Sequence, residues 1–315
     1  MLNELQAPEE AIPDALTGTE KPVILFLLGA VDVGKTHTVT ALANRFYEQQ
    51  LPVAVVDADV GQSDIGPPCC IGMGLVERKL RRLSDAPLRG LYFVGDVSPR
   101  SCTSECVQGT VAAVRKATTL GAAVVIVDST GWVEGEAATA FKLQEIAALH
   151  PALVLAIERG DELGQILTRL TCPVLRIRSS EHVRTRTREE RRALRERAYT
   201  AYFERARRRV FELRVFAWPP AEGSIAGLYS NSNGDTSRGS AEVCGLGIVN
   251  TLDLDRGTAV VATPAPVENR DGALMAIGMI MPGAVKLMNV QGRWKEVRPD
   301  RLLPSKSEPG KDAEE

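Results

Sequence analysis

A glycine-rich segment near the start of the chain has the residue types and spacing that suit phosphate binding. Gly29, Gly34, Lys35 and Thr36 match the pattern GxxxxGK[ST] in full. In such a loop the backbone N–H groups point at nucleotide phosphates, the lysine reaches the β- and γ-phosphate oxygens, and the threonine hydroxyl ligates Mg²⁺. The apolar run 23–28 precedes the motif and a helical apolar pattern follows it, which is the context that the motif requires. The predicted nucleotide-binding residues are Gly29, Ala30, Val31, Asp32, Val33, Gly34, Lys35, Thr36 and His37.

Three aspartates follow apolar runs further along the chain. Asp57 and Asp59 come after the run 53–56, and Asp128 ends the run 124–127. Open α/β sheets place their ligands at the carboxyl ends of strands, so we expect these carboxylates beside the phosphate loop. They indicate a metal site and a general base. Periodicity alone does not assign the two tasks to particular aspartates.

The segment 176–214 is strongly basic although the whole chain has a net charge of −2. It contains 14 Arg and 6 Glu and has no Lys. Because the flat arginine fork matches phosphate oxygens, this composition favours an anionic ligand, and we predict an Arg-rich helical lid here. The alternative is a solvated helix with Glu/Arg pairs, such as Arg192 between Glu189 and Glu196.

The elements that would position these residues alternate between strand and helix. Apolar runs without polar alternation predict strands buried on both faces of a sheet. We expect such strands at 23–28, 53–56, 91–94, 122–127, 153–157 and 174–177, with helices at 104–120 and 137–149. This order predicts an α/β protein with the P-loop NTPase fold and a mainly parallel, doubly wound sheet.

Changes in sequence texture divide the chain into four parts. We predict an N-terminal tail (1–20), a P-loop domain (21–215) that includes the lid (176–214), a small C-terminal β domain (216–304) and a disordered tail (305–315). The β domain is expected because short apolar runs alternate with turn sequences after the Pro219-Pro220 pair.

Composition excludes several classes of protein. With 44% hydrophobic and 25% charged residues, the chain is neither mostly disordered nor fibrous. Its longest apolar run, 23–31, is too short to span a membrane. Six cysteines without a CxxC pair and three histidines argue against a structural zinc site or a disulfide framework. Since no signal-peptide pattern opens the chain, we expect a cytoplasmic protein.

Two further motifs make the sequence resemble a known family. The run 57–62 reads DADVGQ, and Ser129-Thr130-Gly131-Trp132 follows the third aspartate. Together with the phosphate loop and the RxxxR spacings of the lid, they resemble the polynucleotide 5′-hydroxyl kinases, which have a DxDxGQ motif and a TxGW clasp. That family includes the RNA-kinase subunit of the pre-mRNA cleavage complex, nucleolar rRNA-processing kinases and shorter prokaryotic relatives, which this chain resembles most. The resemblance covers roughly residues 22–290.

The resemblance implies roles for particular residues. Asp59 would be the general base, and Asp57 the second acid at the metal. Gln62 would lie beside the transferring phosphate or the substrate 5′ end. The clasp residues, which would bind the substrate nucleotide, are Ser129 (in place of threonine), Gly131 and Trp132.

The lid arginines of the family steady the triphosphate during transfer. Several RxxxR registers occur here, and we favour Arg188, Arg191 and Arg195, which recur at i, i+3 and i+7 on one helical face. With Lys35, Thr36 and Asp128 they complete the expected catalytic and metal set.

The activity that these features predict is Mg²⁺-dependent transfer of the γ-phosphate of ATP, or GTP, to the 5′-hydroxyl of RNA or DNA. One alternative is an ATP-bound, non-catalytic scaffold in an RNA-processing complex. Another is a P-loop NTPase or small-molecule kinase that does not bind nucleic acid. The sequence has no NKxD motif that would select guanine, so ATP is the default nucleotide.

Overall fold

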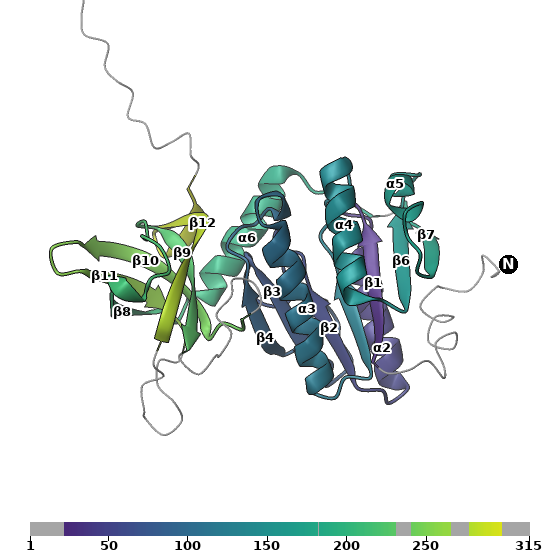
Figure 1. Cartoon of the computed structure of the whole chain (residues 1–315), viewed down its shortest axis with the longest axis horizontal. Coiled ribbons are helices and arrows are strands. Elements are labelled where there is room, and N and C mark those ends of the chain that lie inside the picture. Colours follow the sequence, from purple (N-terminus) through teal and green to yellow (C-terminus); the bar gives the residue numbers. More distant parts are fainter. Residues whose placement is uncertain (1–21, 182, 231–240, 266–276, 298–315) are drawn as a thin grey trace, which may run out of the picture.

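The computed structural model describes residues 22–181, 183–230, 241–265 and 277–297. They form two β-sheets with a long helix between them (Figure 1). Both predicted tails, 1–20 and 305–315, lie outside the described residues. No helix in the described part of the chain is both long and apolar enough to cross a membrane.

The first sheet has seven strands in the order β4-β3-β2-β5-β1-β6-β7. Five of them, β1, β2, β5, β6 and β7, run parallel, because each is joined to its neighbour by matched parallel registers. The residues of β1, β2, β5 and β6 are almost all buried, as expected for apolar runs covered on both faces, whereas those of the edge strand β7 are half-buried or exposed. The mainly parallel α/β fold predicted from the sequence is therefore confirmed. The strand bounds are β1 Val23–Gly29, β2 Val53–Asp57, β3 Cys70–Leu75, β4 Leu88–Phe93, β5 Val124–Asp128, β6 Leu153–Glu158 and β7 Val174–Arg178.

One strand of this sheet was absent from the sequence prediction. β3 pairs antiparallel with β2 on one side and with β4 on the other. Its sequence, CIGMGL, contains two glycines and no β-branched residue apart from Ile71, so its strand propensity is weak. Pairing on both sides, and not local preference, makes it a strand.

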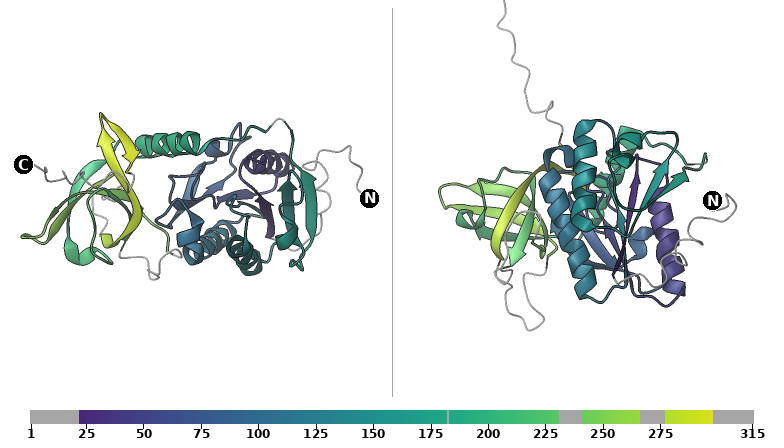
Figure 2. Two further views of the ribbon diagram at one scale, coloured as in Figure 1. Left: turned by 90° about the horizontal axis from the view of Figure 1, so that it is seen from above. Right: turned by 45° about the vertical axis from the view of Figure 1, so that its right-hand side comes forward.

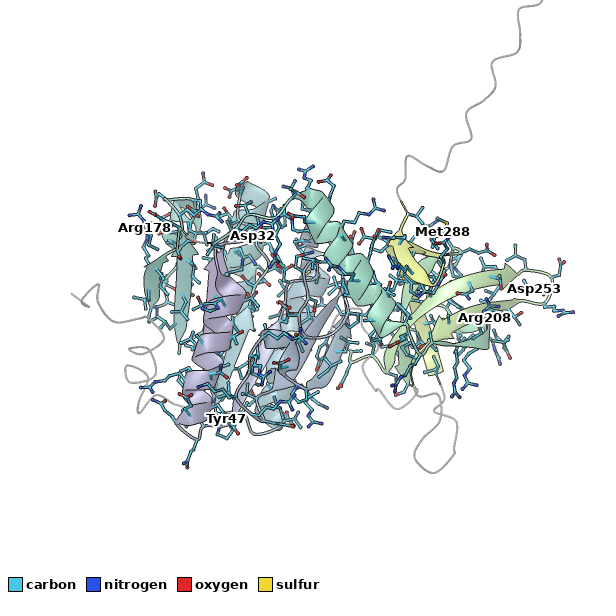
Figure 3. All side chains as sticks on the ribbon, turned by 180° about the vertical axis from the view of Figure 1, so that it is seen from behind. Asp32, Tyr47, Arg178, Arg208, Asp253 and Met288 are labelled. Carbon is cyan, nitrogen blue, oxygen red and sulfur yellow. The ribbon has the colours of Figure 1, made fainter. Side chains whose placement is uncertain are left out.

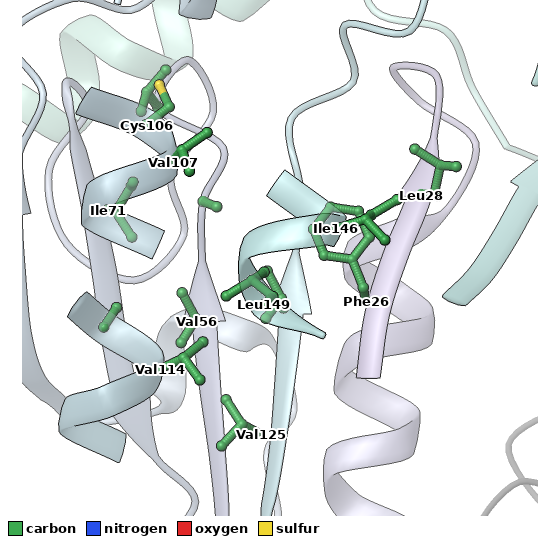
Figure 4. Close-up of a cluster of buried hydrophobic side chains, with 14 of the residues drawn as sticks. Phe26, Leu28, Val56, Ile71, Cys106, Val107, Val114, Val125, Ile146 and Leu149 are labelled. Carbon is green, nitrogen blue, oxygen red and sulfur yellow. The ribbon is translucent and has the colours of Figure 1, made fainter. Parts of the chain in front are cut away.

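Helices cover both faces of the first sheet (Figure 2). Helix α2 (Lys35–Glu48) packs on one face, where Leu25 and Leu27 of β1 point. Helices α3 (Thr103–Thr119) and α4 (Glu136–Leu149) cover the other face, which receives Phe26 and Leu28 of the same strand. Figure 4 shows this second core, with side chains of α3 and α4 against β1, β2 and β5. Side chains that alternate along β1 therefore pack into a core on each face of the sheet. The phosphate loop follows the carboxyl end of this central strand.

The second sheet is antiparallel and has the strand order β13-β12-β9-β10-β11-β8. Its bounds are β8 Arg207–Glu212, β9 Ser224–Ser230, β10 Gly245–Asp253, β11 Thr258–Thr263, β12 Ile277–Val290 and β13 Arg293–Glu296. The C-terminal β domain was predicted to begin at 216, whereas β8 already belongs to this sheet because it pairs with β11 along its whole length. Residues 207–212 are therefore a sheet strand and not part of a helical lid.

Helix α6 (Arg188–Tyr202) connects the two sheets. A capping box starts it, in which the Thr187 hydroxyl accepts from the Glu190 N–H and the Glu190 carboxylate accepts from the Thr187 N–H. At its other end, Tyr199 and Phe203 are buried in a core that also contains Phe93 of β4 and strands of the second sheet. The last turns of α6 are thus fixed between the sheets, and its first turns lie over the phosphate loop.

Helix α4 carries an ion pair that is completely removed from water. The Lys142 Nζ lies 2.7 Å from Oε2 of Glu145, and both side chains are 0% exposed. Lys142 Nζ also lies 4.8 Å from the ring centre of Phe141. Burial raises the pKa of Glu145, and Lys142 opposes that rise.

Removing one member of this pair is expected to destabilise the protein strongly. Lys142→Met should lower the free energy of unfolding by about 3–5 kcal/mol, because it leaves a buried carboxylate without its partner. The double variant Lys142→Met/Glu145→Met should recover most of that loss. Urea unfolding measures both variants, and a single variant as stable as the double one would contradict the prediction.

Candidate active site

The phosphate loop joins the end of β1 to the start of α2 and has the backbone shape of an anion-binding turn. At Gly29 a Cβ atom would lie 2.5 Å from the carbonyl oxygen of Ile157, so no other residue fits without a shift of β6. Gly34, with a φ of 97°, occupies the N-cap position of α2 in the left-handed region. It offers no side chain to the first N–H groups of the helix, which leaves them for an anion.

Lys35 is the first residue of α2 and is 7% exposed. Its Nζ donates to the carbonyl oxygens of Gly29, at 3.0 Å, and Ala30, at 2.8 Å. Burial lowers the pKa of Lys35, and the nearby Asp128 carboxylate works against this shift. The ammonium group therefore already lies within the loop that would hold the phosphates.

Thr36, in the first turn of α2, meets Asp128 at the carboxyl end of β5. The Thr36 hydroxyl donates to Oδ2 of Asp128 at 2.7 Å. Asp128 is 2% exposed, and its Oδ1 is buried without a hydrogen-bond partner in the described part of the chain. Burial raises the pKa of Asp128 to about 6, although Lys35 and the Thr36 hydroxyl act in the opposite direction.

This pair fits a magnesium ion. Mg²⁺ prefers oxygen ligands, is held through one or two protein groups, and takes its other ligands from water and phosphates. A hydroxyl beside a buried carboxylate oxygen without a partner supplies that donor set. Among the described residues no group of three or more His, Cys, Asp or Glu side chains could hold a metal by itself.

Asp57 holds the loop that follows β2. Its carboxylate accepts from the N–H groups of Asp59 (3.1 Å), Asp64 (2.5 Å) and Ile65 (2.9 Å), and from the Ser63 hydroxyl (3.3 Å). Burial raises the pKa of Asp57, and Asp128 and Asp64 add to the rise. Both oxygens of Asp57 thus shape the loop, and its role at the metal stays a prediction.

That loop presents Asp59 and Gln62. Oδ1 of Asp59 accepts from the N–H groups of Gly61 and Gln62, at 3.1 Å each, which fixes the carboxylate in a turn. The Gln62 side chain donates to the carbonyl oxygen of Arg191 at 3.2 Å. The DxDxGQ loop and α6 are thus joined directly.

The segment between β7 and α6 is fastened to the phosphate loop. Asp32 accepts from the N–H of Arg186 at 2.8 Å and from the Arg191 guanidinium at 3.1 Å. The Ser179 hydroxyl donates to the carbonyl oxygen of Val33 at 3.0 Å. Figure 3 shows α6 running from the side of Asp32 towards the second sheet. A carboxylate of the phosphate loop therefore pairs with one of the predicted lid arginines, Arg191.

The three predicted lid arginines do not form one cluster. Arg191 lies at the phosphate loop, whereas Arg195 makes a two-point ion pair with Glu296 of β13, at 2.5 and 2.8 Å. Arg188, in the first turn of α6, is exposed. Helical spacing placed all three on one face, but the second sheet covers only part of that face, and the partners differ along it.

A cavity of about 490 Å³ lies between the phosphate loop, the DxDxGQ loop and the start of α6. Nine predicted residues line it, namely Val31, Asp32, Gly34, Lys35, Thr36, His37, Asp59, Gln62 and Arg191. Four lining residues were not predicted, namely Asp64, Val183, Arg184 and Arg186. The two arginines belong to the basic segment recognised from composition, but periodicity favoured the helix after them. Nothing in the sequence marks Val183 as a site residue.

The clasp packs against the phosphate loop, but its first residue is structural. Ser129 is 0% exposed and donates to the carbonyl oxygen of Leu27 at 2.7 Å. The Ser129 hydroxyl is therefore used inside the sheet, and the substrate-binding role of Ser129 stays a prediction. At Gly131 a Cβ atom would lie 2.6 Å from the backbone nitrogen of Val31, so the absence of a side chain permits this contact.

Trp132 is half-buried beside α4. Its ring stacks on Phe141, with 5.8 Å between ring centres and an angle of 25°. The guanidinium carbon of Arg100, an exposed residue not predicted from the sequence, lies 5.2 Å from the indole centre. The indole Nε1 is buried without a hydrogen-bond partner in the described residues. An aromatic ring supported by α4 and topped by an arginine could bind a base.

The buried charge of Asp128 predicts a pH-dependent effect on stability. The pKa of about 6 in the folded protein exceeds the ordinary aspartate value, so above pH 6 the folded state carries a charge that burial disfavours. Asp128→Asn should therefore have a higher melting temperature than the parent protein above pH 6, without nucleotide and with EDTA. The difference should vanish as the pH falls towards 4, where Asp128 is protonated. A difference that does not change with pH would contradict this assignment.

Comparison with known proteins places this site in a family. The family model described as mRNA cleavage and polyadenylation factor CLP1 P-loop matches residues 29–205. A polyribonucleotide 5′-hydroxyl-kinase of Pyrococcus furiosus is 34% identical over 191 residues, which are 60% of this chain and 52% of that protein. One from Methanocaldococcus jannaschii is 33% identical over 191 residues, with the same coverage of 60% and 52%. The chain spans about half the length of the curated relatives it matches.

The fold also has a close structural counterpart. The structure of the wild-type Clp1p–Pcf11p complex contains a chain that superimposes with a TM-score of 0.67 and 11% identity, over 88% of this chain and 77% of that one. At this identity the likeness concerns the fold. The sequence match extends over more than half of the 315 residues, from the phosphate loop through α6, and it confirms the resemblance drawn from the motifs: the chain belongs to the CLP1 P-loop family.

Proposed function

We propose that this protein transfers the γ-phosphate of ATP, or of GTP, to the 5′-hydroxyl of a polynucleotide. The observation that carries the proposal is that one cavity is lined by all four of Lys35, Thr36, Asp59 and Arg191. A lysine, a metal-binding hydroxyl, a carboxylate and an arginine are the groups that phosphoryl transfer requires. The names of the archaeal relatives support RNA as the acceptor, and DNA remains part of the proposal.

The residues of the cavity divide the work of the reaction. The N–H groups of the phosphate loop and Lys35 hold the β- and γ-phosphates. Thr36 and Asp128 hold Mg²⁺, which when bound neutralises charge on the phosphate oxygens. Arg191 pairs with Asp32 and lines the cavity, and it would exchange that carboxylate for the triphosphate.

Asp59 acts on the acceptor. It accepts the proton of the 5′-hydroxyl while that oxygen bonds to the γ-phosphorus and the bond to the bridging oxygen of the leaving diphosphate breaks. Asp57 keeps Asp59 in place through the loop hydrogen bonds, and Gln62 ties that loop to α6. A nucleotide-bound scaffold would not require a carboxylate in this position, and no observation favours that alternative or a small-molecule kinase.

The proposal is tested by incubating the protein with γ-labelled ATP or GTP, Mg²⁺ and 5′-hydroxyl oligonucleotides of RNA and DNA. Label should appear on the oligonucleotide, and Lys35→Ala should abolish transfer because it removes charge stabilisation. Release of phosphate that does not respond to oligonucleotide would instead indicate an NTPase. Tight nucleotide binding without turnover would indicate a scaffold.

The identity of the base is tested by Asp59→Asn, which keeps size and hydrogen bonding but removes basicity. We expect kcat to fall about 10²- to 10⁴-fold while the Kd for ATP is retained. The same substitution at Asp64, the other aspartate lining the cavity, is the comparison. A larger loss of kcat in Asp64→Asn, with Asp59→Asn active, would contradict the assignment.

Trp132→Ala tests the clasp. Loss of a stacking contact worth about 1–3 kcal/mol should raise the KM for the oligonucleotide about 5- to 150-fold and leave the KM for ATP nearly unchanged. Trp218→Ala, in the second sheet region, is the control. If Trp132→Ala lowers the melting temperature by several degrees and impairs both substrates equally, the indole is a core residue supported by Phe141, and the clasp prediction fails.

A further inference from the structure

Exposed arginines continue beyond the cavity, from the outer face of α6 to the edge of the second sheet. Arg197 is exposed on α6, Arg205 follows the helix, and Arg207 and Arg208 are exposed on β8. We call these four residues the basic track. Figure 3 labels Arg208 at the far end of α6 from Asp32. Within the described residues no acidic side chain forms an ion pair with any of the four.

The surroundings of β8 leave this charge uncompensated. β8 is the last strand in the order of its sheet, so it has a neighbour on one side only. That neighbour, β11, reads TAVVAT and carries no charge. Residues 203–211 contain four Arg and one Glu, Glu204. The next acid, Glu212, is already paired with Arg214.

The arginines on the inner side of α6 show the contrast. Arg192 is paired with Glu196 at 3.0 Å, and Arg195 with Glu296 at 2.5 Å. The first pair lies within α6, the second holds α6 against β13, and both satisfy their charges within the protein. The basic track has no such structural task. Arg207 and Arg208 are successive residues of an edge strand and so present charge on both of its faces, and exposed, unpaired arginines attract a partner with many negative charges.

The position of the track favours a polynucleotide over other anionic partners. Helix α6 has 15 residues and is therefore about 22 Å long. Its first turns contact the phosphate loop through Arg191, and the track begins on its outer face and continues past its last turn. A chain whose 5′ end lies at Asp59 would reach the track only after several nucleotides. Arginine forks match the phosphates of such a chain.

We propose that the basic track binds the phosphate backbone of the acceptor polynucleotide several nucleotides away from its 5′-hydroxyl. This inference rests on the proposed function, because it assigns a second contact to the same substrate. It predicts that long acceptors bind more tightly than short ones, and that the added affinity falls steeply with salt.

The test compares two acceptor lengths. The variant Arg205→Gln/Arg207→Gln/Arg208→Gln should raise the KM for a 5′-hydroxyl RNA of about 20 nucleotides about 10- to 100-fold, and leave unchanged the KM for one of about 4 nucleotides and the kcat for both. The slope of log KM against log salt for the long RNA should become shallower by about 2, since each lost phosphate contact on a single strand contributes about 0.7.

A matched variant removes the same charge elsewhere. Arg78→Gln/Arg81→Gln/Arg115→Gln changes three exposed arginines away from α6 and β8, since Arg78 and Arg81 follow β3 and Arg115 lies on α3. It should behave as the parent protein on both RNAs. Equal KM values for the long RNA in the two variants, or an equal loss on both lengths in the track variant, would overturn the inference.

Failure of the proposed function gives a different result. If the parent protein labels neither RNA, the kinase assignment fails, and fluorescence anisotropy with a labelled RNA of about 20 nucleotides still tests the track. Weaker binding by the track variant than by the matched variant supports the contact. Equal binding by the two variants refutes the contact with RNA. The basic track would then be a binding site for an anionic protein surface.

Discussion

The parallel register of β2, β5 and β1 is the constraint on which the site depends. Asp57 lies opposite Asp128 in adjacent strands, and Asp128 lies opposite Leu27, two residues before the phosphate loop begins. A strand rises about 3.3 Å per residue and its side chains alternate between faces, so a slip of one residue would move each carboxylate to the other face of the sheet. Buried apolar side chains on both faces prevent such a slip. The core therefore determines that Thr36, Asp128 and the DxDxGQ loop lie together.

This arrangement brings negative charge into a place that water does not reach. Burial raises the pKa of both Asp57 and Asp128, and Asp128 keeps an oxygen without a partner in the described residues. Buried charges and polar atoms without a partner lower the free energy of unfolding. They are retained where a cation or a proton to be moved would satisfy them, which is why perturbed carboxylates gather at functional sites. Lys35, whose own pKa is lowered by burial, is the complementary charge within the same loop.

Helix α6 makes the second sheet part of the same machinery. One end touches the phosphate loop through Asp32 and the DxDxGQ loop through Gln62. The other end is buried with Tyr199 and Phe203 between the sheets, and Glu296 holds Arg195 from the side. The last turns of α6 are thus fixed by a hydrophobic core, whereas polar contacts tie its first turn to the site. Arg191 lies in that first turn, and Arg195 is held from the second sheet.

Patterns of neighbouring residues in the sequence predicted the elements whose formation depends mainly on those neighbours. The phosphate loop, the five parallel strands and the helices α2, α3 and α4 follow from apolar runs and glycine positions. The antiparallel strand β3 did not, because pairing on both sides makes it a strand. Residues far away in the sequence also determine which contacts Ser129 and Arg195 make. The Ser129 hydroxyl donates to the carbonyl oxygen of Leu27, and Arg195 forms an ion pair with Glu296. Helical spacing identifies which side chains share a face. It does not say which of them meets a phosphate, because that depends on the surface packed against each turn of the helix.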